Sequence, residues 1–449
     1  MQATVRRPTA PRRAAPPVRA AAPLPAAPRA DPRTWVRALA AVSLVVLGYR
    51  YSLPQGLQLG HVAALVLLPV WWASMTRRRG GTTFVLLGLL AAVAGVWLGV
   101  ANAPDHEIGG TTALPMTVTL VGAVLSVGLF AWGLDVLRPH RAVLWYGVGF
   151  ALAFSPSTTL FASNPWKFGF AVPVTVISLA LAHRLGRRYE LAALAALTVT
   201  AALNDFRSAF GLLLLATILL FAQMVLGRSR RRASAVAVLV GLAALGVAVF
   251  QLGQALILDG YLGAETQARS LEQLRSSGSL VLGGRPELAA TFALMEDHPW
   301  GYGVGSVPTP EDVRVAKEGM NAIGYQPDNG YVERFMFGGN FELHSVFGNL
   351  WAQSGLVGLA FVALVLAVLV VGVVSRVSDR TASGILLYAA AQSAWNVFFA
   401  PFYTSVPVLV LALALAFLPA RRSPGDAPPL SPAATPRRWS SRPASSAPR

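Results

Sequence analysis

The sequence predicts an all-α polytopic membrane protein with about twelve transmembrane helices and one large helical extracytoplasmic loop. Hydrophobic residues make up 54% of the chain and charged residues only 13%, whereas soluble domains carry about 25% charged residues. The mean hydropathy is +0.54. Apolar runs of about 20 residues, the length that crosses a bilayer, recur along the whole chain. These observations exclude a soluble enzyme with one large core.

Twelve segments have the length and apolar character of a membrane span. From the N-terminus they lie at about 34–52, 60–76, 82–101, 113–136, 142–155, 169–183, 189–203, 208–226, 233–257, 346–373, 382–399 and 404–420. Arginine clusters fall in every second connection between them, as the positive-inside pattern requires. The clusters are Arg77 to Arg79, Arg138 with Arg141, Arg184 with Arg187 and Arg188, Arg228 with Arg230 to Arg232, Arg376 with Arg380, and Arg421 with Arg422. The pattern places the N-terminus and all these clusters in the cytoplasm.

The formal charge of +17 is therefore explained by topology rather than by nucleic-acid binding. Residues 1–33 and 421–449 are rich in Pro, Ala and Arg and are predicted to be disordered cytoplasmic tails. We expect no cleavable signal peptide, because the first tail has no apolar core. The chain has no cysteine, which excludes disulfides and thiolate metal sites.

The predicted outer connections are short except for residues 258–345. A loop of this length is usually functional or disordered. Its sequence predicts a polar helix from Glu265 to Ser276 and a second helix from Pro286 to Met295, with proline in the first turn. A compact turn should follow at 300–305. We therefore expect an ordered extracytoplasmic cap between helices 1–9 (34–257) and helices 10–12 (346–420).

Positive residues on the outer side are rare, so each invites a functional explanation. Arg207 lies in a very short outer loop, where it either extends to lipid headgroups or holds phosphate oxygens with its planar fork. Arg285 precedes the second loop helix, whose N-terminus already favours anions. The alternative for Arg285 is a solvated loop arginine.

His344 stands where the long loop re-enters the membrane. Histidine accepts a proton from a hydroxyl near neutral pH, which suits a general base. The alternative is a loop histidine that only hydrogen-bonds its surroundings. Asp105 and Glu107 form an acidic pair that either holds a divalent ion or is simply solvated. No cluster has good metal spacing, so we expect no metal site and no cofactor.

Three segments resemble the O-antigen ligase and O-antigen polymerase superfamily. They are DFRSA at 205–209, Arg285 followed by EDHPWGYGVG at 296–305, and HSVFGNLWAQSGLVGL at 344–359. Family members carry a similar arginine and D-H-P-x-x-G-x-G run, and a similar re-entry motif. The resemblance covers about residues 200–360, and Phe206 stands where Ser or Thr is common.

The resemblance implies a GT-C-like, metal-independent, inverting glycosyltransferase in the bacterial plasma membrane. Such an enzyme moves a glycan from a polyprenyl-diphosphate carrier to an acceptor hydroxyl on the outer face. By motif, Arg207 and Arg285 would hold the donor diphosphate and His344 would act as general base. Loop aromatics are candidates for stacking on sugars: Trp300, Tyr302, Tyr325 and Tyr331. The implied partners are the lipid-linked donor, a glycan, lipid or protein acceptor, and membrane lipids.

Three alternatives remain from the sequence. A flippase or transporter for lipid-linked oligosaccharides shares the many helices, but it would favour charges within helices and related halves. A structural scaffold would need none of the three candidate residues. A metal-dependent transferase would use Asp105 and Glu107. The residues do not distinguish ligase from polymerase, nor do they identify the glycan, the acceptor, the envelope type or the oligomeric state.

Overall fold

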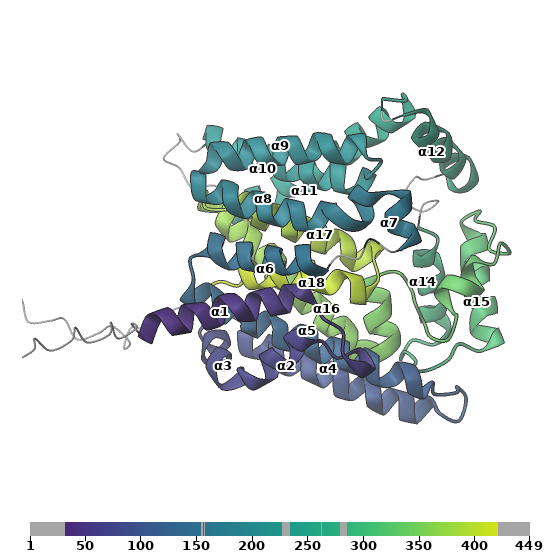
Figure 1. Ribbon diagram of the computed structural model, residues 1–449. Helices are drawn as coiled ribbons and strands as arrows, with labels where there is room; N and C mark the ends of the chain where they lie inside the picture. The colour runs from purple at the N-terminus through teal and green to yellow at the C-terminus, as the bar shows by residue number, and fades with distance from the viewer. Residues whose placement is uncertain are drawn as a thin grey trace, which may run out of the picture.

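The computed structural model describes residues 32–153, 156, 158–226, 234–261, 263–278 and 285–420. This part of the chain forms helices and no strand (Figure 1). The first half contains α1 (Pro32–Tyr49), η1 (Pro54–Gly56), α2 (Leu59–Val66), α3 (Leu68–Thr76), α4 (Gly81–Asn102), α5 (Gly110–Val136), α6 (Pro139–Ala153), α7 (Thr159–Ser163), η2 (Trp166–Phe170), α8 (Ala171–Leu185), α9 (Arg187–Leu203) and α10 (Arg207–Leu226). The second half contains α11 (Ala235–Leu258), α12 (Ala264–Ser277), α14 (Glu287–Asp297), α15 (Pro310–Ala322), η3 (Val332–Met336), α16 (Val346–Ser378), α17 (Gly384–Phe399) and α18 (Phe402–Ala416).

Helices occur at all twelve segments that the sequence predicts as spans. Six of them, α4, α5, η2 with α8, α10, α11 and α16, are long and apolar enough to cross a bilayer, and α2 with α3 would make a seventh. An all-α, multi-pass membrane protein is thus supported, while the count of twelve spans stays a prediction. The two predicted tails and the arginines at 228–232 lie outside the described residues, apart from the first residues of α1.

The predicted helix at 60–76 is broken. Its two halves, α2 and α3, meet at a bend of 75°. Pro69 lies in the first turn of α3, where it cannot donate to the preceding turn and its ring clashes with a continuing helix. The break is therefore a direct consequence of this proline.

The arginine clusters and the long loop lie at opposite ends of α4. Next to the start of α4, Arg78 donates to Asp135 Oδ1 at 2.8 Å. Arg376 caps the end of α18 through the carbonyl of Ala416 at 2.8 Å, and the backbone of 77–79 pairs with 418–420. At the other end, Asn102 donates to the carbonyl of Tyr302 at 2.9 Å. The 22 residues of α4 span about 33 Å, close to the roughly 30 Å of a bilayer's hydrocarbon core.

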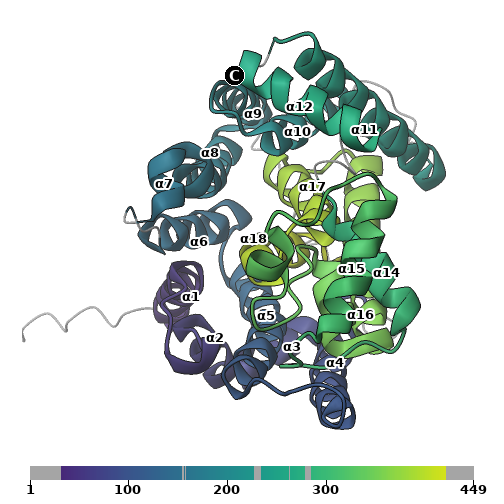
Figure 2. The same ribbon diagram turned by 90° about the vertical axis from the view of Figure 1, so that its right-hand side faces the viewer.

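The segment between α11 and α16 folds against one end of the bundle, at the right of Figure 1. Both helices predicted there are confirmed as α12 and α14, and α15 is an additional helix. A small apolar core joins α14, α15 and η3 to the start of α16. In the view down the bundle, α14 and α15 lie in front of α16, and α18 lies among the other helices (Figure 2). Nearly every residue of α18 is buried.

The glycines at 301–305 allow this segment to touch the bundle closely. A Cβ on Gly303 would lie 2.0 Å from the amide nitrogen of Gly99, and one on Gly301 would lie 2.5 Å from the carbonyl of Trp351. The backbone N–H groups of Tyr302 and Gly303 both donate to the Ala352 carbonyl at 2.8 Å. The compact turn thus packs closely against both α4 and the first turns of α16.

Candidate functional site

Arg207 begins α10 after a tight turn, and α12 packs over this turn. Asp205 in the turn has a φ of +48°, a left-handed conformation that aspartate tolerates better than most residues. Thr266 donates to Asp205 Oδ1 at 2.9 Å, and Arg207 Nη1 donates to Ser270 Oγ at 2.9 Å. Both partners on α12 are buried, and they lie four residues apart on one face of the helix. The polar helix of the loop therefore fixes the Arg207 turn.

The structure brings the two predicted arginines to one cavity. Arg207 and Arg285 both line a space of about 330 Å³, together with Asp205, Gln254 and Trp395. Arg285 is half-buried, and its guanidinium makes no side-chain hydrogen bond or ion pair to any described residue. The fork of Arg285 is thus available to a ligand in this cavity.

The same cavity has a third cation, Lys167, which is not among the site residues predicted from the sequence. Lys167 lines the cavity from η2, with its ammonium 5.8 Å from the ring of Phe206. Its segment is tied to the Arg207 turn, since Asn164 donates to the carbonyl of Asn204 at 2.7 Å. Among the described residues that line it, three cations outnumber the one carboxylate of Asp205, and this positive charge favours an anion. The signal was present: Lys167 is one of two lysines in the chain, and it falls in a predicted outer loop.

His344 is held in one tautomer by its own backbone. It has a φ of +50°, and its Nδ1 lies 2.9 Å from the carbonyl oxygen of Glu342. Because a carbonyl only accepts, Nδ1 must carry the hydrogen, which leaves the lone pair of neutral imidazole on Nε2. Ser345 follows and caps α16 by accepting from the N–H of Gly348 at 3.0 Å. The site thus presents a histidine whose Nε2 is the proton acceptor.

His344 does not line the arginine cavity, but Tyr331 connects the two. The Tyr331 ring lies 6.1 Å from the His344 ring, and its hydroxyl donates to the buried carboxylate of Glu287. Burial and then the charge of Glu287 raise the pKa of Tyr331, while the nearby Arg285 opposes the shift. The base and the arginine cavity are therefore neighbours, linked through a neutral tyrosine that the sequence placed only among possible sugar contacts.

Trp300 and Tyr302, two of the four aromatics predicted to contact sugars, have different environments. Trp300 is 66% exposed, whereas Tyr302 is fully buried. The Tyr302 ring is stacked 3.9 Å from Phe341 and 4.7 Å from His298. Tyr302 thus holds the loop core together in this structure, whereas Trp300 offers an accessible ring face and Tyr325 and Tyr331 are half-buried.

The acidic pair considered for a metal does not converge on other ligands. Asp105 and Glu107 are both exposed. The residue between them, His106, is buried and lies 3.1 Å from Asp312 through its Nε2. Within the described ranges, no three His, Asp or Glu side chains are grouped as metal ligands would be. His106 instead joins the α4–α5 connection to the start of α15.

Comparison with models of known protein families, with curated proteins and with solved structures produces no match. Only the motifs and this geometry therefore indicate what the protein does. What the geometry offers is an electropositive cavity beside a histidine with a free Nε2, at the end of the helix bundle opposite the arginine clusters. An anionic leaving group and a hydroxyl nucleophile are the reactants that such groups serve.

Proposed function

We propose that the protein is a glycosyltransferase that moves a glycan from a polyprenyl-diphosphate carrier to an acceptor hydroxyl at the extracytoplasmic face of a bacterial plasma membrane. The observation that carries the proposal is the shared cavity of Arg207 and Arg285. Arg207 begins α10 and Arg285 lies just before α14. Each lies in a segment that resembles an O-antigen ligase or polymerase motif. The position of the cavity at the end of an apolar bundle suits a lipid-linked donor.

The arginines would bind the donor diphosphate and stabilise it as it leaves. Cleavage of the glycosidic bond to the carrier places additional negative charge on the diphosphate. Guanidinium groups form charge-assisted, often paired, hydrogen bonds with phosphate oxygens, and fixed donors aimed at developing charge lower the barrier. Lys167 adds a third positive charge to the same cavity. In this proposal the cations do the work for which a metal-dependent enzyme would use a divalent ion.

His344 would act as the general base. Its Nε2 accepts the proton of the acceptor hydroxyl as the oxygen attacks the anomeric carbon, and the carbon–oxygen bond to the diphosphate breaks. Attack opposite the leaving group inverts the anomeric centre. The Glu342 carbonyl, which accepts from Nδ1, supports the positive imidazolium that forms. Whether the acceptor is another repeat unit or a different molecule decides between polymerase and ligase.

The experiment is a transfer assay with protein purified into nanodiscs. A fluorescent polyprenyl-diphosphate oligosaccharide is incubated with candidate acceptors, and products are separated from the carrier. We expect His344→Ala to reduce transfer about 10²–10⁴-fold while the protein still binds the donor. His140→Ala, at the arginine-rich end, is the matched control. Full activity in folded Arg207→Ala, Arg285→Ala and His344→Ala variants would contradict the assigned roles. Transport that leaves glycan and carrier joined would instead indicate a flippase.

A further inference from the structure

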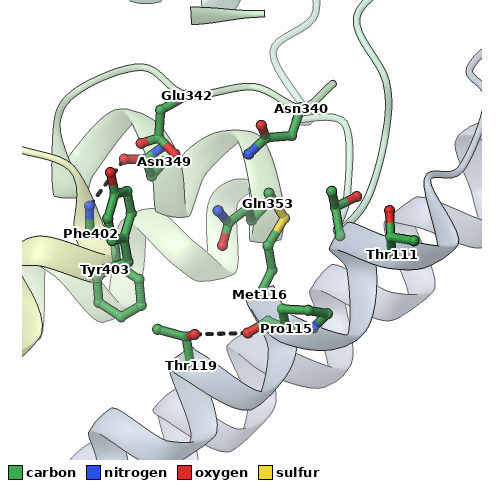
Figure 3. Close-up of a pocket in the computed structure, with 11 residues that line it drawn as sticks. Thr111, Pro115, Met116, Thr119, Asn340, Glu342, Asn349, Gln353, Phe402 and Tyr403 are labelled. Carbon is green, nitrogen blue, oxygen red and sulfur yellow. Dashed lines mark hydrogen bonds between the residues drawn. The ribbon is translucent and has the colours of Figure 1, made fainter. Parts of the chain in front are cut away.

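A second cavity lies beside Glu342, the residue whose carbonyl accepts from His344. It has a volume of about 230 Å³ and is enclosed by the first turns of α5, the segment 340–342, the first turns of α16 and the start of α18 (Figure 3). None of the residues that line it also lines the arginine cavity. Glu342, whose carbonyl holds His344 Nδ1, contributes its side chain to this second cavity. We call it the Glu342 cavity.

The Glu342 cavity contains buried polar atoms that have no hydrogen-bond partner in the described part of the chain. Gln353 is 8% exposed, and its side-chain amide points into the cavity in Figure 3. This amide forms no hydrogen bond with any described residue. Glu342 Oε1 is buried and likewise lacks a partner in the described part of the chain. Buried polar atoms are normally hydrogen-bonded. These two groups therefore indicate a polar ligand that supplies donors to a carboxylate and both donors and acceptors to an amide.

The charge and shape of the cavity define the ligand further. Its only charged lining residue among those described is Glu342, and the remaining polar residues are hydroxyls and amides, including Thr111, Thr119 and Asn340. A carboxylate repels a diphosphate but accepts hydrogen bonds from neutral hydroxyls. Tyr403, which is 53% exposed, adds an aromatic ring at the wall. This combination fits a neutral, hydroxyl-rich ring.

The size of the cavity argues for a single ring. Pockets for drug-sized ligands occupy about 300–1,000 Å³, and the Glu342 cavity is smaller. Its framework is fixed, because Asn349 accepts from the N–H of Phe402 and donates to the carbonyl of Phe341, both at 3.2 Å. These bonds tie α16, α18 and the 340–342 segment together before any ligand arrives.

We propose that the Glu342 cavity binds the terminal sugar ring of the acceptor, apart from the arginine cavity that would hold the donor diphosphate. This inference rests on the proposed function and deepens it. Donor and acceptor then occupy separate cavities of opposite electrostatic character. In-line attack requires this arrangement, because the nucleophile approaches from the side away from the leaving group. Glu342 and Gln353 hold ring hydroxyls, so that a neighbouring hydroxyl faces the histidine.

Saturation-transfer NMR with wild-type protein in nanodiscs tests the sugar site directly. The probes are the methyl glycosides of glucose, galactose, mannose, rhamnose and N-acetylglucosamine, used without any donor. We expect at least one glycoside to bind. Gln353→Leu, which keeps the side-chain volume but removes both polar groups, should weaken binding about three- to tenfold. Thr111→Val, at the exposed rim of the cavity, should also weaken it without disturbing the packed interior.

Inorganic pyrophosphate, followed by ³¹P NMR, separates this proposal from the proposed function. Gln353→Leu should leave pyrophosphate binding unchanged, whereas Arg285→Ala should weaken it and leave glycoside binding unchanged. If Gln353→Leu abolishes both pyrophosphate and glycoside binding, this variant is misfolded. Glycoside binding by Thr111→Val then tests the sugar site. The sugar site is overturned if no glycoside binds the wild type, or if both cavity variants bind as the wild type does. Glycoside binding without pyrophosphate binding would refute the donor site and leave the sugar site intact.

Discussion

Replacement of Arg285 should weaken catalysis through the donor and through little else. Its guanidinium has no hydrogen bond or ion pair with a side chain among the described residues, so Arg285→Ala breaks no such bond and removes only its electrostatic effect on Tyr331. Arg207 is different, because it also donates to Ser270 of α12. An effect of Arg285→Ala can therefore be attributed to a lost interaction with the substrate.

The expected magnitude follows from the hydrogen bonds that the arginine can offer. A paired contact with a diphosphate comprises two bonds to a charged group, each worth about 1.5–3 kcal/mol. Arg285 is half-exposed, so solvent screening favours the lower bound, about 3 kcal/mol in total. This corresponds to a loss of about 10²-fold in kcat/KM. Arg285→Lys keeps the charge but not the planar fork, and we expect a loss of roughly tenfold.

The assay measures initial rates of glycan transfer at several donor concentrations, with thermal unfolding of each variant as the check on folding. Arg334→Ala is the matched control, since Arg334 is exposed in the same loop but does not line the arginine cavity. Rates within twofold of wild type for Arg285→Ala, or equal losses for Arg285→Ala and Arg334→Ala, would refute the donor role.

Three further predictions concern the neighbouring groups. Tyr331→Phe leaves both oxygens of the buried Glu287 carboxylate without a partner, so it should destabilise the protein by about 1–3 kcal/mol, seen in thermal unfolding. Burial raises the pKa of Glu342 against a smaller opposing effect of its neighbouring histidine. The folded state then binds this proton more tightly than the unfolded chain, and stability should fall as pH rises from about 4.3 through the folded pKa. Glu342→Gln should remove this fall, and an unchanged pH profile would contradict the raised pKa. Asp312→Ala removes the partner of His106 and one half of the capping box of α15, and should speed amide hydrogen exchange in α15 about tenfold or more.

Much of the fold can be predicted from the sequence because long apolar runs and arginine clusters are local signals. The break between α2 and α3 also had a local signal in Pro69. So did α15, where Thr309 and Asp312 form a capping box ahead of apolar residues at helical spacing. Neither feature follows from hydropathy alone, because the apolar run at 60–76 is continuous across Pro69 and α15 is amphipathic rather than apolar.

The site was only partly predictable. Arg207 and Arg285 stand out in the sequence as rare outer cations, and Lys167 has the same property. Their convergence depends on how α12 packs over the α10 turn, which no local pattern determines. Tyr302, by contrast, is predicted from the sequence to contact sugars because it is an aromatic residue in a glycine-rich turn. In the structure its neighbours bury it completely. The Glu342 cavity is formed by four separate segments and is visible only in three dimensions.

The central claim is metal-independent transfer from a polyprenyl-diphosphate donor with His344 as base. The most direct measurement incubates purified protein with a lipid-linked oligosaccharide and candidate acceptors, with and without EDTA, beside His344→Ala. We expect transfer that EDTA does not diminish and that His344→Ala reduces about 10²-fold or more, while both proteins bind the donor. Loss of transfer in EDTA with recovery on addition of Mg²⁺, or no transfer to any acceptor by protein that binds the donor, would contradict it.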